Sequence, residues 1–296
     1  MTPLLLLFAL AVSSANTRVE ALDRCVTRRD RACVSALLAQ ASDEKSPEYW
    51  AAAARAELLL GKRQDAVQAV NRALELKPGD FDLLMEQGWV YQKSGDQVSA
   101  IRSFLSASQI EPRTPAVYYE IGMSFFLLHE FDRAIIHFKR VLELDPQHDR
   151  AEFMLGLVDV LRNGDAEAQA HFQRAMALQP DNPHYLLHYG VLLVQLNETD
   201  KALKLMLKAE ELDESNPLTH FNLGTLYRQI GKLPEAEREL RTAVQLRPGL
   251  ARAHYQLATV YRLEGKTREA ASALQQFEKF KENDNNDDPI DARLTQ

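Results

Sequence analysis

The sequence predicts an all-α solenoid of antiparallel helix pairs, and three regularities support this fold class. Proline recurs on one grid of 34 residues, at Pro78, Pro112, Pro146, Pro180 and Pro248. Small residues recur at fixed places within each period, and a turn-forming residue separates two apolar-periodic stretches of roughly 12–14 residues. Strict self-similarity at such a period is typical of stacked units that cannot bury their apolar faces alone.

Seven consecutive units follow this grid when each unit starts three residues after a grid point. They start at Pro47, Phe81, Pro115, Asp149, Pro183, Pro217 and Ala251. In every unit the eighth residue is glycine or alanine and the twentieth is alanine, so two helix backbones can approach closely. Proline after the second stretch ends that helix, and Asp or Asn beside it supplies a cap in several units.

One unit shows the full pattern. It carries Gly88, Tyr91, Gly95, Ala100, Phe104, Ala107 and Pro112. This pattern resembles the tetratricopeptide repeat family, and the resemblance covers Pro47 to about Asp284 as seven repeats. It implies a right-handed superhelical solenoid that binds protein or peptide partners. The first and last units depart from the family, with Glu57 in place of an aromatic residue, and Phe277 and Glu282 in place of Ala and Pro.

The N-terminus carries an apolar run from Leu4 to Val12, followed by small residues. Nine apolar residues are too few to span a bilayer as a helix, and this arrangement suits a secretory signal peptide, residues 1–15, cleaved after Ala15. We therefore expect an exported protein, periplasmic or secreted. The alternative is a cytoplasmic protein whose first solenoid helix is this run.

The only two cysteines are Cys25 and Cys33. On one continuous helix they would lie about 12 Å apart, too far for a disulfide. The repeat pattern extended backwards puts a turn near Thr27, so residues 16–46 are expected to form a capping hairpin that brings the thiols together. A disulfide there would need an oxidising compartment, which agrees with export. The alternative is two buried free thiols in a cytosolic protein.

Composition and motifs argue against several classes of function. A net charge of −7 disfavours a sequence-independent nucleic-acid binder. There is no phosphate-binding loop, serine elbow or Cys–His nucleophile pair, so we expect no catalytic residue, cofactor or metal site. His184 and His188 are the best metal candidate, which keeps a metal-dependent hydrolase as the enzyme alternative, but two ligands do not make a site. Residues 285–296 read as an acidic disordered tail.

The resemblance also places a partner-binding groove. In the family, the second, fifth, ninth, twelfth and thirteenth residues of each repeat tend to face the concave surface. The chosen groove residues, apolar first and then polar or basic, are Met85, Trp89, Tyr119, Met123, Phe126, Phe153, Leu157, Val160, Leu187, Val191, Asn222, Arg228, Arg252 and Arg262. The hypothesis is that the apolar part holds an amphipathic helix or extended peptide, while the arginines favour an acidic group. The alternative is that the apolar residues pack against neighbouring helices.

Some family members clamp the C-terminal carboxylate of cytosolic chaperones. Asn222 matches that clamp and Arg252 stands in place of its lysine, but Leu187, Val191 and Gln256 do not fit. The sequence therefore predicts an exported, non-enzymatic scaffold or adaptor with a protein partner and no transmembrane segment. The alternatives are a cytosolic adaptor, or an array that self-associates through an apolar end face at Leu274, Phe277 and Phe280.

Overall fold

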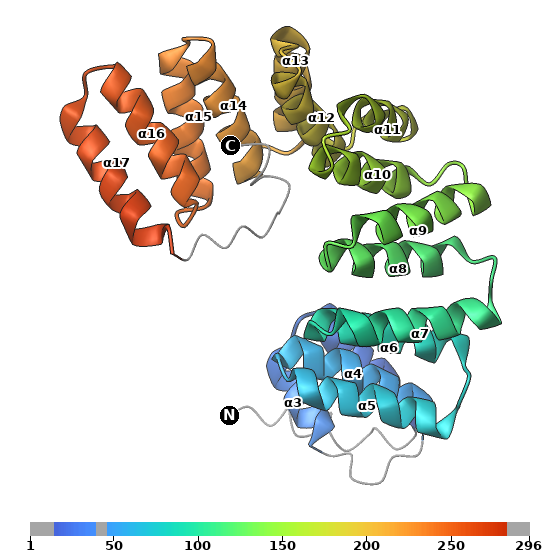
Figure 1. Cartoon of the computed structure of the whole chain (residues 1–296). Helices are drawn as coiled ribbons and strands as arrows, with labels where there is room; N and C mark the ends of the chain where they lie inside the picture. Colours follow the sequence, from blue (N-terminus) through green and yellow to red (C-terminus); the bar gives the residue numbers. More distant parts are fainter. Residues whose placement is uncertain (1–14, 40–45, 283–296) are drawn as a thin grey trace. The chain divides into compact units, whose positions relative to one another are not determined.

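The computed structural model describes residues 15–39 and 46–282, and every regular element in these ranges is an α-helix (Figure 1). The helices form consecutive pairs joined by short turns. The pairs are α2 (Ala15–Thr27) with α3 (Arg31–Leu38), α4 (Pro47–Leu60) with α5 (Arg63–Leu76), α6 (Phe81–Ser94) with α7 (Gln97–Ile110), α8 (Pro115–Leu127) with α9 (Phe131–Leu144), α10 (Asp149–Leu161) with α11 (Asp165–Leu178), α12 (Pro183–Gln195) with α13 (Thr199–Leu212), α14 (Pro217–Gln229) with α15 (Leu233–Leu246), and α16 (Ala251–Leu263) with α17 (Thr267–Phe280). The all-α prediction, with one helix pair for each 34-residue repeat, is confirmed.

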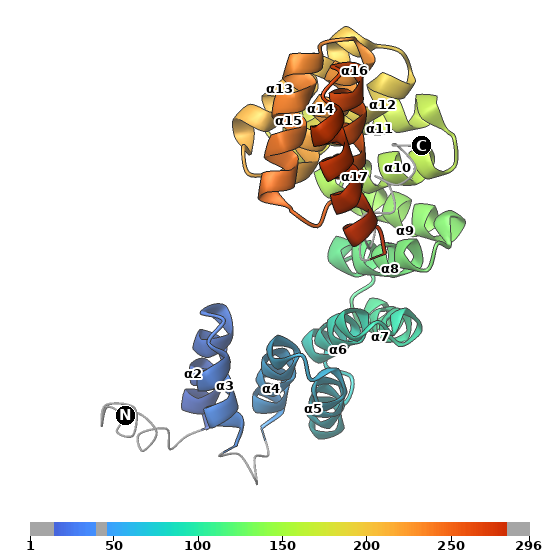
Figure 2. The ribbon, with the colours of Figure 1, turned by 90° about the vertical axis from the view of Figure 1, so that its left-hand side faces the viewer.

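The chain divides into two compact units, Met1–Pro146 and Gln147–Gln296. Within the described ranges, unit 1 holds α2–α9 and unit 2 holds α10–α17. Within each unit the second helix of a repeat packs on its own pair partner and on the first helix of the next pair, as α5 does on α6 and α13 does on α14 (Figures 1 and 2). At the N-terminal end, α2 also packs on α4. This is the stacking expected when no single pair can bury its apolar face.

Local sequence explains where the helices begin. The Asn182 side chain accepts hydrogen bonds from the backbone N–H groups of His184 and Tyr185, at 3.0 and 3.4 Å, and so caps α12. Asp80 caps α6 in the same way, through the N–H of Leu83 at 3.0 Å. Such caps satisfy backbone donors that have no partner inside the helix.

The turn inside each pair needs a left-handed residue. Gly61 and Gly95 end α4 and α6 at φ values of 81° and 91°, while Asn163 and Asn197 take φ 60° at the equivalent places. Glycine and asparagine are the residues that adopt this conformation most readily. The breaker residues of the sequence pattern therefore lie at the turns.

The core lies between the two helices of each pair. The alanine at the twentieth position is fully buried in six repeats and nearly so in the seventh; these residues are Ala66, Ala100, Ala134, Ala168, Ala202, Ala236 and Ala270. Large side chains fill the space beside them, among them the fully buried rings of Phe104, Phe138 and Phe172.

Two predicted segments fall largely outside the described residues: the signal peptide, residues 1–15, of which only Ala15 is described, and the acidic tail, residues 285–296. Among the described helices, none combines the length and apolar character needed to cross a bilayer.

Candidate functional site

All fourteen predicted groove residues lie on the first helix of their repeat, and in each unit we call the surface that its members define the helix-A face of that unit. In unit 1, Met85 and Trp89 lie on α6, and Tyr119, Met123 and Phe126 lie on α8. Met85, Tyr119 and Phe126 are buried, Met123 is half-buried, and Trp89 keeps 40% of its surface exposed. Trp89 is therefore the most accessible large apolar side chain of the predicted set in this unit.

Internal contacts account for the buried members of this set. The Tyr119 ring lies 5.7 Å from the Phe138 ring, and the Phe126 ring lies 5.9 Å from the Phe131 ring, both distances between centroids. Phe131 and Phe138 belong to α9, the pair partner of α8. These aromatic residues contribute to packing within their own repeat.

The apolar residues predicted in unit 2 are also mainly internal. Leu157, Val160, Leu187 and Val191 are buried. Phe153 is half-buried, and its ring stacks on Tyr185 of the next repeat with 4.5 Å between centroids. Phe153 is thus the accessible member of the apolar set in this unit.

The polar and basic residues of unit 2 have a different environment. Asn222 is buried, and its amide donates to the Leu218 carbonyl at 2.9 Å, within α14. The Arg252 guanidinium lies 5.0 Å above the Phe221 ring, which fixes its position by a cation–π contact. Arg228 is half-buried, and Arg262 is exposed on the same helix as Arg252.

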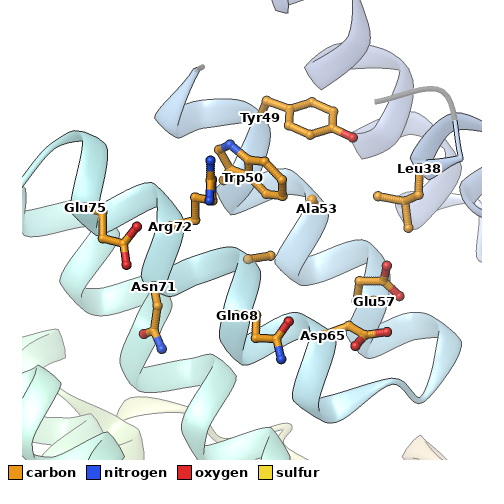
Figure 3. Close-up of a pocket in the computed structure, with 11 residues that line it drawn as sticks. Leu38, Tyr49, Trp50, Ala53, Glu57, Asp65, Gln68, Asn71, Arg72 and Glu75 are labelled. Atoms are coloured by element: carbon orange, nitrogen blue, oxygen red, sulfur yellow. The ribbon is translucent and has the colours of Figure 1, made fainter. Parts of the chain in front are cut away.

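Unit 1 also contains a pocket of about 540 Å³ between α3, α4 and α5 (Figure 3). The Arg72 guanidinium lies 5.5 Å above the Trp50 ring, and Glu57, Asp65 and Glu75 line the same pocket. None of its lining residues belongs to the predicted groove. Sequence reasoning missed it because the space depends on how the end of α3 meets α4, which the repeat pattern does not determine.

The two cysteines lie across the turn of the N-terminal hairpin. Cys25 is in α2 and Cys33 is in α3, with 5.9 Å between their Cα atoms and their sulfur atoms at bonding distance. Asp30 caps α3 by accepting from the Cys33 N–H at 3.0 Å. Leu22 and Val34 are fully buried in the same core cluster as Tyr49 and the alanines of α4.

Unit 2 buries charged side chains between helices, which sequence analysis did not predict. Glu152 of α10 bonds to His171 Nδ1 at 2.6 Å and accepts from Arg174 Nε at 2.9 Å. His220 of α14 lies with Nδ1 2.8 Å from Glu239 Oε2 of α15. This hydrogen bond raises the pKa of His220 despite its burial.

The described residues include one group whose ligand atoms are close enough to share a metal ion, namely Glu210, His220 and Glu239. The pair chosen from the sequence behaves differently. His184 is exposed, whereas His188 is buried with its ring 5.4 Å from the Phe153 ring. A sequence pattern of two histidines four residues apart could not reveal ligands contributed by three separate helices.

Comparison with known proteins is informative at the level of family and fold. A tetratricopeptide repeat model matches residues 1–183, and two further tetratricopeptide repeat models match residues 166–220 and 221–287. No curated protein matches the sequence.

Solved structures give the same likeness. A tetratricopeptide repeat protein from Parabacteroides merdae is 16% identical, with a TM-score of 0.64 over 85% of this chain and 98% of that one. The Cut9–Hcn1 hetero-tetramer of the APC/C gives a TM-score of 0.64 at 15% identity, over 86% of this chain, which spans only 50% of the matched chain. YrrB, described as having an unusual peptide-binding site, gives a TM-score of 0.50 at 22% identity, over 66% of this chain and 98% of that one. Similarity at these identities concerns the fold.

Proposed function

Because the chain belongs to the tetratricopeptide repeat family, we propose that it is a non-enzymatic scaffold that binds a protein or peptide on its helix-A face. We further propose that it works in the periplasm or cell envelope, within an assembly, secretion or export complex. Proteins of this family bind protein or peptide partners, and YrrB is a structural relative described with a peptide-binding site.

The exposure of the Trp89 side chain is the observation that carries the proposal. Trp89 keeps 40% of its surface exposed, while most other apolar residues of the predicted groove are covered by the chain itself. A large aromatic ring that is left accessible on a rigid helix is the usual kind of anchor at protein interfaces. We therefore assign partner contact in unit 1 to Trp89, with Met123 one repeat further along the helix-A face.

In unit 2 we assign partner contact to the arginines. Arg252 is held against the Phe221 ring, and Arg262 is exposed on the same helix. The exposed Arg262 presents a planar fork of donors that suits a carboxylate. Arg252, whose Nε and Nη1 atoms are buried, contributes its positive charge, and it loses less conformational entropy on binding because its side chain is already held in place. The chemistry expected of the partner here is an acidic side chain or a free C-terminus.

A matched pair of substitutions tests the role of the helix-A face. Trp89→Asp and Leu105→Asp introduce the same charge into neighbouring helices of one repeat, at side chains with 40% and 41% exposure. Tagged wild-type and variant proteins are used to capture partners from an envelope extract of the native host, with folding checked by circular dichroism.

We expect Leu105→Asp to retain the proteins that the wild type captures and Trp89→Asp to lose them. Retention of the same proteins by a folded Trp89→Asp variant would contradict the assignment of this face.

Location needs a separate test, because the apolar run that predicts export lies outside the described ranges. What supports export is the N-terminal apolar run, together with two cysteines at bonding distance. Intact mass of the protein from its native host, before and after reduction and alkylation, is the measurement. We expect loss of residues 1–15 and alkylation of both cysteines only after reduction. A full-length chain with two freely alkylated thiols would favour the cytosolic adaptor instead.

A further inference from the structure

Three helices of unit 2 bring two carboxylates and an imidazole together. Glu210 comes from α13, His220 from α14 and Glu239 from α15. His220 Nδ1 lies 2.8 Å from Glu239 Oε2 and 3.5 Å from Glu210 Oε1, and all three ligand atoms fall within 4.8 Å of one another. His220 and Glu239 are buried, whereas Glu210 retains 26% side-chain exposure, so the cluster reaches solvent along Glu210.

The surrounding hydrogen bonds orient these groups. His220 Nε2 lies 3.0 Å from the Glu214 carbonyl oxygen, which can only accept, so Nε2 carries a proton and donates. Nδ1 faces the two carboxylates and hydrogen-bonds to Glu239 in the metal-free protein, and it would give up its proton on binding a metal ion. Arg238 donates from Nε and Nη2 to Glu239 Oε1, at 2.9 and 2.7 Å, which directs the other oxygen of Glu239 towards His220. Metal-binding histidines and carboxylates are commonly held by outer hydrogen bonds of this kind.

The positions equivalent to Glu210, His220 and Glu239 in the other repeats do not carry two carboxylates and a histidine together. The equivalent sets are Leu74, Leu84 and Ser103; Ser108, Tyr118 and His137; Leu142, Glu152 and His171; Met176, Leu186 and Leu205; and Val244, His254 and Ala273. His254 even repeats the Nε2 bond to a backbone carbonyl, at 2.9 Å to Pro248, without any carboxylate at the other two positions. The three ligand types are therefore not a requirement of the repeat fold.

We propose that Glu210, His220 and Glu239 form a binding site for one zinc ion in unit 2. Zinc bound by nitrogen and oxygen ligands at about 2.0–2.2 Å in tetrahedral geometry needs ligand atoms roughly 3.3–3.5 Å apart. The distance from His220 Nδ1 to Glu210 Oε1 already meets this spacing, and that to Glu239 Oε2 needs to lengthen by about 0.5 Å. Water completes the fourth position on the open side, beside Glu210. This site does not depend on the proposed scaffold function.

The electrostatics favour a cation here. Two carboxylates converge on one imidazole nitrogen, and Arg238 pairs with the oxygen of Glu239 that faces away from His220. The Arg238 side chain is 66% exposed, so solvent screens its charge. A divalent ion at this point would link α13, α14 and α15 and so join the fifth and sixth repeats.

Zinc binding to the purified, tag-free full chain tests the site directly. The protein is freed of metal with a chelator and titrated with Zn²⁺ alone by calorimetry, with Co²⁺ absorption as a second probe of coordination. We expect one zinc ion per chain, and a loss of affinity of at least about 10–100-fold in His220→Ala and in Glu239→Gln. His254→Ala is the matched control and should bind as the wild type does.

Glu210→Gln guards against misfolding, because Glu210 is the partly exposed ligand and its substitution keeps both members of the 2.8 Å pair between His220 and Glu239. A folded Glu210→Gln variant should also lose zinc affinity, and the visible Co²⁺ spectrum should lose its four-coordinate intensity. The proposal is overturned if the wild type binds no zinc at micromolar concentration, or if its affinity is unchanged in both Glu210→Gln and His220→Ala.

Discussion

The contact between the eighth and twenty-fourth residues of each repeat sets how closely its two helices approach. A Cβ atom added to Gly88 would lie 2.3 Å from the Phe104 ring, and one added to Gly122 would lie 2.7 Å from the Phe138 ring. In the first repeat the eighth residue is Ala54, and the twenty-fourth residue is Val70, which is smaller than the phenylalanine found opposite Gly88 and Gly122. In these repeats the two positions complement each other in volume.

This complementarity predicts the effect of Gly88→Ala. Because the Phe104 ring is fully buried, we expect the added methyl group to destabilise the protein by about 1–3 kcal/mol in urea unfolding. The double variant Gly88→Ala with Phe104→Val copies the Ala54–Val70 pair and should be more stable than the sum of the two single changes implies. Gly249→Ala is the control, since a Cβ there meets nothing within 4 Å. Unaltered stability of Gly88→Ala would contradict the packing described.

Buried Glu152 predicts a dependence of stability on pH. Burial acts most strongly and would raise its pKa, but the hydrogen bonds with His171 and Arg174 outweigh it and hold the pKa below 4.5. A carboxyl group with a lowered pKa in the folded state stabilises the protein above its unfolded pKa, and this contribution is lost as pH falls through the folded pKa.

We therefore expect Glu152→Gln to lower the free energy of unfolding by about 1–3 kcal/mol at pH 7. The difference from the wild type should shrink as pH falls below 4.5, in urea titrations at several pH values. A difference that stays constant or grows on acidification would count against the ion pair.

Individual residues were predictable to different degrees. The sites where paired helices approach closely could be predicted from the recurring alanine and glycine residues, because close approach of two backbones permits few residue types. The exposure of Met85, Tyr119 or Phe126 did not follow, because a repeat pattern gives the angular position of a residue on its helix but not what covers it. Glu210 and Glu239 escaped notice because they meet His220 only when three helices are assembled.

At the scale of elements, the N-terminal hairpin depends on more than apolar packing. α3 has only 8 residues, and short helices gain little from their own hydrogen bonds. The repeat pattern, continued from the later repeats towards the N-terminus, predicts a turn near Thr27, and α2 does end at that residue. The link between Cys25 and Cys33 closes a short loop around that turn.

Reduction of this link should loosen the hairpin selectively. A crosslink closing a loop of this size is worth about 2–3 kcal/mol in the chain-entropy model. Hydrogen–deuterium exchange should therefore quicken in α2 and α3 after reduction, while α6–α9 keep their protection. The variant with both cysteines replaced by serine should exchange like the reduced protein. Equal protection of α2 and α3 in oxidised and reduced protein would show that packing alone holds the hairpin.

At the scale of the whole molecule, the period of 34 residues predicted stacked helix pairs because each pair has an apolar face that only a neighbour can cover. The identity of a partner does not follow from this argument. Among the apolar residues of the predicted groove in unit 1, the structure leaves Trp89 and Met123 at least partly accessible. The proposed scaffold function would therefore use a small part of the predicted groove.

Site-specific photo-crosslinking in cells of the native host tests this claim most directly. A photoreactive phenylalanine analogue replaces Trp89 in one protein and Leu105, equally exposed on the paired helix, in another. We expect a discrete crosslinked adduct from position 89 and none from position 105. No adduct at position 89, or the same adduct from both positions, would contradict a partner-binding helix-A face.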